Sequence, residues 1–148
     1  MFEGSIFDIS ASALTAERLR LDVISNNIAN VNTTRTPSGG PYKRQMPVFE
    51  PRSGNFGQFL NAIKNKTGPK VALGVRVAAI VDDPAPPRLV YDPTHPDANA
   101  DGYVAFPDIN IVKEMVDMIS ASRAYEANVT ALNEAKAMMQ SALGIGRV

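Results

Sequence analysis

The sequence has no cysteine and only one histidine, His95. Disulfide bonds, iron–sulfur clusters and the usual zinc sites are therefore excluded, because each needs cysteine or several histidine ligands. The sequence also lacks an excess of charge of either sign, since 15 Lys and Arg residues balance 15 Asp and Glu residues. A protein that binds nucleic acid usually carries a basic excess or patch, so nucleic acid is not an expected partner.

Long hydrophobic runs are absent as well. No apolar run approaches the roughly 20 residues that span a bilayer. The N-terminus has no basic segment followed by an apolar one, so no cleavable signal peptide is expected. The 148 residues suffice for one domain with a modest core. The eleven Pro and ten Gly residues concentrate in the middle of the chain, between two ends with helical patterns.

The C-terminal stretch predicts one long helix, because no Pro or Gly interrupts residues 109–143. Pro107 and Asp108 suit its start, and Gly144 suits its end. At 1.5 Å per residue such a helix is roughly 50 Å long. Apolar residues recur every seven positions, with a companion row four positions later, which predicts a coiled-coil seam. The two rows are Ile111, Met118, Tyr125, Leu132 and Met139, and Met115, Val129 and Leu143.

The same helix carries a second row, made of small side chains. Its members are Ala121, Ala124, Ala131, Ala135 and Ala142. Small side chains let another backbone approach closely, whereas an ordinary surface face would carry Lys and Glu. This row predicts a second helical neighbour. The alternative is that Ala is present only as a good helix former.

Residues 5–30 predict a second heptad helix, at the N-terminal end. Phe7, Leu14, Leu21 and Ile28 repeat every seven residues, and Ile24 and Val31 form the companion row. The simplest packing is an antiparallel coiled coil of the two end helices. Four Asn residues between positions 26 and 32 weaken the end of this helix, because their amides compete with the backbone. These amides can cap the helix or bond to neighbours, and a helix end that runs into a polar loop explains them equally well.

The middle of the chain predicts a small β module of three strands on alternating apolar residues and turn signals. An extended segment over residues 42–49 is weaker, since Pro47 favours an edge strand or no pairing. Residues 52–69 are compatible with a short helix or a docked loop. The fold class is therefore α+β, with long end helices in an antiparallel coiled coil, a small β-rich centre and long loops. The strands are Val71–Val81, Arg88–Tyr91 and Gly102–Phe106, and the segments are 1–33 (helix), 34–70 (connector), 71–106 (β module) and 107–148 (helix).

One segment has the residue types of a calcium loop. Asp97, Asn99 and Asp101 precede Gly102 as in the opening of an EF-hand, and Asp108 falls at the twelfth position. Prolines directly before and inside the segment oppose an EF-hand. Asp, Asn and Gly also favour tight turns between strands, so a turn is the preferred interpretation and no metal is expected.

No arrangement of residues predicts catalysis. His95 lies between prolines without a recognisable Cys, Ser or second His partner, which favours a role in stabilising its loop or simple exposure. Neither a phosphate-binding Gly-rich loop nor a nucleophile elbow of the Gly-x-Ser-x-Gly type is present. We therefore expect no enzyme, no cofactor and no small-molecule substrate.

The two ends together resemble a known family. Residues 21–33 and 114–128 are similar to the N-terminal and C-terminal signatures of the bacterial flagellar rod and hook proteins. Residues 39–44, 90–97 and 102–104 are similar to the proximal-rod members of that family. Two positions depart from the family pattern, in motifs without an expected catalytic group: Ala13, where Gly is frequent, and Asp108, where Asn is usual.

The resemblance implies a structural protein of the bacterial flagellum. Such a protein is exported from the cytoplasm by the flagellar type III export apparatus without cleavage of a signal peptide. It assembles helically into the hollow rod that spans the periplasm and transmits torque from motor to hook. The implied partners are further copies of the chain, other rod proteins and the base of the rod at the membrane ring.

Together, the patterns and the resemblance predict that three groups of residues make three different kinds of contact. Large apolar residues hold the coiled coil, Ala124, Ala131 and Ala135 face a neighbouring helix, and residues 26–32 contact the next subunit. The predicted assembly and coiled-coil residues are Leu14, Leu21, Ile24, Asn27, Ile28, Asn30, Met115, Met118, Tyr125, Ala131 and Leu132.

Overall fold

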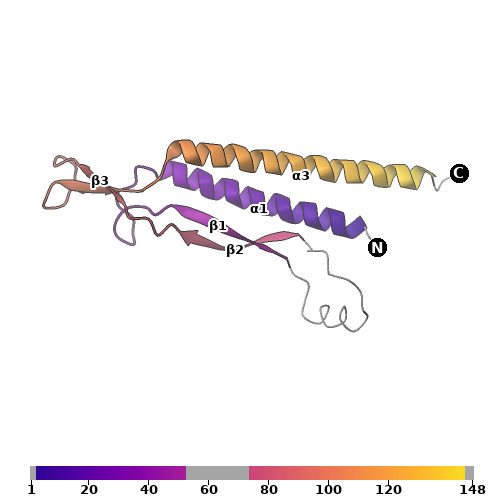
Figure 1. The fold of residues 1–148 in the computed structure, drawn as a ribbon, viewed down its shortest axis with the longest axis horizontal. Coiled ribbons are helices and arrows are strands. Elements are labelled where there is room, and N and C mark those ends of the chain that lie inside the picture. The colour runs from indigo at the N-terminus through magenta and orange to yellow at the C-terminus, as the bar shows by residue number, and fades with distance from the viewer. Residues whose placement is uncertain (1–2, 53–73, 146–148) are drawn as a thin grey trace, which may run out of the picture. The chain divides into compact units, whose positions relative to one another are not determined.

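The structure, a computed structural model, describes residues 3–52 and 74–145. A long helix stands at each end of the described chain, with four strands between them (Figure 1). In order, the elements are α1 (Glu3–Ala29), β1 (Gln45–Pro51), β2 (Val75–Asp82), β3 (Arg88–Tyr91), β4 (Tyr103–Phe106) and α3 (Ile111–Ile145). This arrangement confirms the α+β fold class. No helix in the described ranges is both long and apolar enough to cross a membrane.

The helices follow the predicted ranges, but α3 starts differently. The side-chain Oδ1 of Asn110 accepts a hydrogen bond from the Lys113 N–H at 3.2 Å. The Asn110 carbonyl accepts the first bond of the helix, from the Glu114 N–H at 3.0 Å. Asn110 is therefore the N-cap, and the predicted start at Pro107 and Asp108 is wrong, because an Asn side chain three residues before Lys113 reaches its orphan donor.

The strands form two separate two-stranded sheets, β1–β2 and β3–β4, rather than one module of three strands. In the second sheet the strands are antiparallel, with Arg88 opposite Phe106 and Tyr91 opposite Tyr103. Residues 42–49 do contribute a paired strand. Pro47 is tolerated in it because both strands of a two-stranded sheet are edge strands. The predicted residues 71–73, and the predicted short helix or loop after Arg52, lie outside the described residues.

By internal contacts the chain divides into two compact units, each with parts of both helices and of β1 and β2. The first unit comprises residues 1–18, 49–78 and 123–148, and the second comprises residues 19–48 and 79–122. In the second unit, Arg20 lies 3.8 Å from Asp117, and Asn27 donates a hydrogen bond to Glu114 at 3.1 Å. Residue numbers rise along α1 as they fall along α3, so the helices are antiparallel in this unit.

The buried row of α3 keeps the heptad spacing but not the predicted phase. Glu114, Ala121 and Ala135 are buried, and they are separated by seven and fourteen residues. Ile111 and Met115, which were predicted in the seam, are 45% and 53% exposed. That prediction is wrong because small side chains and a paired carboxylate occupy the inner face, where bulky side chains would hold a neighbouring backbone away.

The prediction that Ala135 faces a neighbouring subunit stays a prediction. Ala135 is buried within the chain and lines a groove together with Ile6 and Phe7 of α1. Among the described residues, the buried hydrophobic side chains are few and mostly small: Ala16, Val23, Ile24, Val104, Ala121 and Ala135.

Candidate functional site

Asn27, near the end of α1, has its side chain fully buried and fully bonded. Its Nδ2 donates to the Gln45 carbonyl at 2.9 Å, and its Oδ1 accepts from the Gln45 N–H at 2.9 Å. The amide thus pairs with both main-chain groups of Gln45, as a neighbouring strand would. Nδ2 also donates to Glu114 Oε2 at 3.1 Å, and Oδ1 accepts from the Tyr42 hydroxyl at 3.0 Å. All four hydrogen-bonding positions of the amide are used.

Glu114 is a buried carboxylate on α3 whose two oxygens both have partners. Oε2 accepts from Asn27, and Oε1 accepts from Arg44 Nε–H at 2.6 Å. The Arg44 guanidinium also lies 3.6 Å from Asp83 and 3.7 Å from Asp117. A buried charge is stable only when it is paired and hydrogen-bonded, and Glu114 meets both conditions.

These residues form what we call the polar node: Asn27, Tyr42, Arg44, Gln45 and Glu114. The polar node lies wholly in the second unit and joins the end of α1, the segment that enters β1, and the start of α3. Burial raises the pKa of the Tyr42 phenol above its ordinary value, and the negative charges of Asp82 and Glu114 add to this. The phenol therefore stays protonated at neutral pH and serves as a donor.

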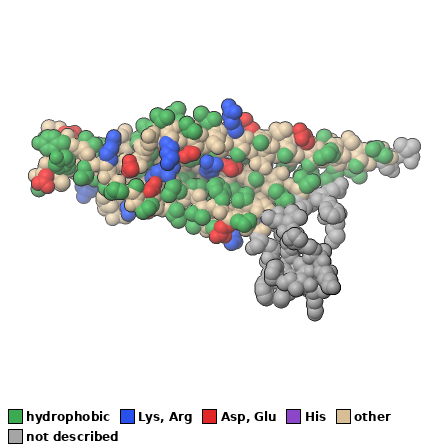
Figure 2. All heavy atoms as spheres, in the orientation of Figure 1, with side chains coloured by type: hydrophobic (Ala, Val, Ile, Leu, Met, Phe, Trp, Pro, Cys, Tyr) green, Lys and Arg blue, Asp and Glu red, His purple; other side chains and the backbone are tan. Residues whose placement is uncertain are grey.

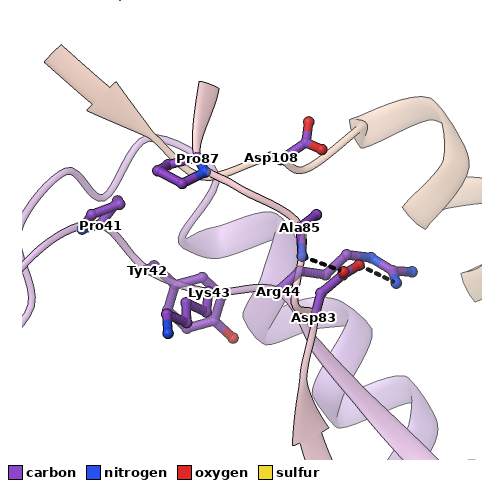
Figure 3. A pocket seen from close by; sticks show the side chains of 8 residues that line it. All are labelled: Pro41, Tyr42, Lys43, Arg44, Asp83, Ala85, Pro87 and Asp108. Carbon is purple, nitrogen blue, oxygen red and sulfur yellow. Dashed lines mark hydrogen bonds and ion pairs between the residues drawn. The ribbon is translucent and has the colours of Figure 1, made fainter. Parts of the chain in front are cut away.

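A small cavity of about 100 Å³ lies beside the polar node (Figure 3). In Figure 3 the Arg44 guanidinium reaches toward the Asp83 carboxylate, which also accepts a hydrogen bond from the Ala85 N–H at 3.0 Å. Ligand pockets occupy roughly 300–1,000 Å³, so this cavity is too small for a typical substrate. Its lining is Pro41, Tyr42, Lys43, Arg44, Asp83, Ala85, Pro87 and Asp108.

The segment with calcium-loop residue types is a turn between β3 and β4. Asn99 Oδ1 accepts hydrogen bonds from the N–H groups of Asp101 and Tyr103, at 3.0 and 2.8 Å. The Asp97 carboxylate accepts from the Thr34 hydroxyl at 2.8 Å and lies 3.8 Å from Arg35. These oxygens stabilise the chain's own loops, which confirms the turn interpretation. In the described ranges, no three His, Cys, Asp or Glu side chains are grouped so that they could hold a metal ion.

His95 also stabilises this loop, as predicted. Its Nδ1 accepts a hydrogen bond from the Asp97 N–H at 3.1 Å, and its ring packs edge-on against Phe106 at 6.2 Å between centroids. The nearby Asp92 carboxylate accepts two hydrogen bonds from Thr94, and these bonds lower its pKa. The loop thus uses its polar groups for its own conformation.

The predicted assembly residues lie in different environments. Ile24 is buried, and Met115 and Ala131 are exposed. Asn30 donates to the Asn26 carbonyl at 2.9 Å and accepts from the Thr33 hydroxyl at 3.1 Å, so it caps the end of α1. The others are partly buried: Leu14, Leu21, Ile28, Met118, Tyr125 and Leu132.

The Asn27 amide makes all its hydrogen bonds within the chain, and the prediction that residues 26–32 contact the next subunit stays a prediction. Sequence reasoning also missed Tyr42, Arg44 and Glu114. One signal was available. Glu114 stands seven residues before Ala121, so the row of small residues places a carboxylate on the inner face of α3.

Basic and acidic side chains are interspersed over the face drawn in Figure 2, with no large patch of one sign. This distribution agrees with the zero net charge.

Comparisons with known proteins match both ends and the centre of the chain. A family model described as "Flagella basal body rod protein" matches residues 7–35, and one described as "Flagellar basal body rod FlgEFG protein C-terminal" matches residues 100–145. The flagellar basal-body rod protein FlgC of Borreliella burgdorferi is 53% identical over 149 residues, which cover 95% of each chain. The FlgC proteins of Bacillus subtilis and Escherichia coli O157:H7 are 46% and 42% identical over 144 residues, which cover 95% and 97% of each chain.

Proposed function

The chain belongs to the FlgC family of flagellar basal-body rod proteins, and we propose on this premise that it is a structural subunit of the proximal rod. The single observation that carries the proposal is the 53% identity to a FlgC protein over 95% of both chains. In this role the chain assembles helically with other rod proteins into the hollow shaft that transmits torque from motor to hook.

The geometry supports a structural role. The charged and amide groups of the polar node hold α1, α3 and the start of β1 together. The polar groups of three further residues stabilise one turn: His95, Asp97 and Asn99. The relatives that the chain resembles are rod proteins, which supports the proposal that the chain is not an enzyme.

We propose that the partners are further copies of this chain, other rod proteins and the base of the rod at the membrane ring. Long helices support this, since a 35-residue helix of roughly 50 Å offers a long interface for resisting torque. Ala131 is exposed on α3, as a residue that faces a neighbouring subunit must be. In this proposal residues 1–33 and 107–148 form the coiled-coil core, and residues 34–70 and 71–106 form the connector and the β module.

We propose that the chain is exported in unfolded form through the flagellar type III export apparatus and reaches the periplasm-spanning rod without cleavage of a signal peptide. Two observations support export in this form. No disulfide can form, because cysteine is absent. Few large hydrophobic side chains are buried among the described residues, so little hydrophobic burial opposes unfolding.

The test is made in the bacterium that produces the chain. Deletion of its gene should abolish motility, and purified basal bodies should lack a complete rod in electron micrographs. Restoring the natural gene should restore both. Ala131→Glu should be exported yet fail to assemble, because a charge replaces a small side chain at a close contact.

His95→Ala is the matched control and should leave motility intact. Complete rods in the deletion strain would refute the proposed function. Normal motility with Ala131→Glu would refute only the contact at Ala131.

A further inference from the structure

The sheet formed by β1 and β2 presents apolar side chains to solvent (Figure 1). Val48 and Phe49 of β1 are 40% and 38% exposed, and Ile80 and Val81 of β2 are 45% and 39% exposed. In the described part of the chain this sheet has two strands, so both are edge strands. Exposed apolar edge strands pair readily with strands of other chains, which leads to aggregation. The sheet therefore needs features that oppose the addition of a strand.

Hydrogen bonds at the two ends of β1 show which of its residues face β2. The Arg44 carbonyl accepts a hydrogen bond from the Asp83 N–H at 2.7 Å. At the other end, the Arg52 N–H donates to the Gly74 carbonyl at 2.8 Å. Residues that face a given neighbour alternate along a strand, so the even positions of β1 direct their main-chain groups toward β2 and the odd positions direct theirs away. The outward-facing residues are Gln45, Pro47, Phe49 and Pro51.

Three of these four outward-facing residues cannot bond fully to an added strand. Pro47 and Pro51 have no N–H. The N–H and the carbonyl of Gln45 are both bonded to the Asn27 amide, at 2.9 Å each. An antiparallel neighbour exchanges two hydrogen bonds with each residue that faces it, so half of the possible bonds are lost, two at Gln45 and one at each proline. Phe49 is the outward-facing residue of β1 at which neither feature operates.

The outer edge of β2 is closed at its first residue and distorted further along. Val75 follows Gly74, whose carbonyl faces β1, so the main-chain groups of Val75 face outward. The Val75 N–H donates to the Ser12 hydroxyl of α1 at 3.1 Å. Between the same two bonded pairs, β1 has 7 residues and β2 has 8. One residue of β2 is therefore a bulge, which interrupts the regular row of outward-facing groups and increases the local twist.

We propose that these features form an edge protection that keeps this sheet from pairing with strands of other chains. On β1 the edge protection consists of Asn27, Pro47 and Pro51, and on β2 it consists of Ser12 and the bulge. The Asn27 amide occupies the main-chain groups of Gln45 as a third strand would, so the end of α1 stands where an added strand would begin. The inference does not depend on the proposed function.

Restoring the missing donors tests the proposal on the full purified chain. Pro47→Val together with Pro51→Thr gives the outer edge of β1 two further N–H groups. Thioflavin T fluorescence and light scattering over a concentration series measure association through strands. Because two further hydrogen bonds strengthen such a contact, we expect the double variant to associate at about one-tenth of the concentration that the natural chain needs.

Pro84→Val together with Pro86→Thr is the matched control, because both prolines lie in the loop between β2 and β3. This control makes the same chemical change outside a strand and should leave association unchanged. Far-UV circular dichroism shows whether each variant keeps its helices. The single variants Pro47→Val and Pro51→Thr restore one donor each, and they test the proposal through a smaller effect when the double variant fails to fold.

A further change separates the N–H of Phe49 from its apolar side chain. In the double variant, Phe49→Pro removes the N–H, whereas Phe49→Ala removes the phenyl ring and keeps the N–H. We expect association of the Phe49→Pro chain to need a concentration several-fold higher than that of the Phe49→Ala chain.

Three results would overturn the proposal. The first is unchanged association in the folded proline variants of β1. The second is equal promotion of association by the Pro84 and Pro86 control. The third is an equal effect of Phe49→Pro and Phe49→Ala, which would assign association to the exposed side chain rather than to the strand edge.

Discussion

Each of the two compact units is stabilised internally by a different kind of contact. The second unit contains the polar node, where Arg44 and Glu114 form an ion pair with side chains 14% and 1% exposed. An ion pair of the first unit, Arg76 with Glu50, has side chains 65% and 49% exposed. There α1 instead presents small buried residues, and the Ser12 hydroxyl accepts a hydrogen bond from the Val75 N–H at 3.1 Å.

The difference bears on how strictly each unit specifies its packing. A shift of α1 along α3 in the second unit would leave Glu114 or Asn27 buried without partners, at a high free-energy penalty. In the first unit, alanine, serine and methionine side chains accept small shifts more easily. Our hypothesis is that the polar node sets the register of the helix pair, and that the first unit adapts to neighbours.

The largest expected effect is at the ion pair of the polar node. Arg44→Met leaves the buried Glu114 carboxylate without its cation, so we expect the free energy of unfolding to fall by about 3–5 kcal/mol. Urea denaturation followed by circular dichroism measures this. Replacing both partners, with Arg44→Met and Glu114→Met together, should recover much of the loss, since no buried charge remains.

Arg76→Met in the first unit is the matched control. It breaks an exposed pair and should change the free energy of unfolding by about 1 kcal/mol or less. Equal losses for Arg44→Met and Arg76→Met would show that burial of the polar node has no energetic consequence, and the comparison between the units would fail.

The next effect is at Asn27. Asn27→Ala leaves the partly buried N–H and carbonyl groups of Gln45 without their side-chain partners, which should lower the free energy of unfolding by about 2–3 kcal/mol. Asn30→Ala, which loses only bonds within the end of α1, should cost about 1 kcal/mol or less. Should both variants unfold at the same urea concentration, Asn27 would be an ordinary capping residue.

A smaller effect is expected in the first unit, at Gly74. Its φ is +105°, and a Cβ there would overlap the Ser12 side chain, so Gly74→Ala should destabilise by about 1–3 kcal/mol. Gly39→Ala, at φ +87° in open space, carries only the backbone strain. Ser12→Ala combined with Gly74→Ala should recover the part due to overlap. Thermal unfolding that shows no recovery would assign the whole effect to backbone strain.

The smallest effect concerns pH. Because the folded state raises the pKa of Tyr42, that group's contribution to stability is present below its ordinary pKa of about 10 and is lost as pH rises through the folded value. Tyr42→Phe should therefore flatten the fall in stability above about pH 10. Tyr103→Phe, at an exposed phenol, is the control; an identical slope in both variants would exclude Tyr42 as the cause.

Local patterns were sufficient to predict much of the fold. The strand Arg88–Tyr91 was predicted with its bounds, and both helices were predicted to within two residues at all four ends. Turn chemistry correctly predicted the turn at Asn99, since Asx turns depend on neighbours in the sequence. Pairing was harder to predict, because whether three strands share a sheet depends on contacts between distant segments. In the described part of the chain, four strands form two sheets.

The polar node shows what sequence reasoning missed in the site. Arg44 and Glu114 are 70 positions apart, and nothing near either residue marks the other as its partner. Met115 illustrates a related error, in which the wrong row of the helix was assigned to the buried face. A heptad row of large apolar residues was assigned to the inside, yet the structure buries Glu114 and Ala121 and exposes Met115. Periodicity predicts that a helix has an inner face, but the partner determines which row occupies it.

By itself the sequence determined the long end helices, the heptad spacing, the absence of disulfides and the family, because these depend on local order and on residue identity. Only the tertiary structure decided which row of α3 is buried, that Asn27 completes the main-chain bonding of Gln45, and that Val112, Val116 and Ile119 remain exposed. Burial depends on which surfaces meet. A buried carboxylate such as Glu114 is tolerated only where a distant residue, here Arg44, is brought within hydrogen-bonding distance.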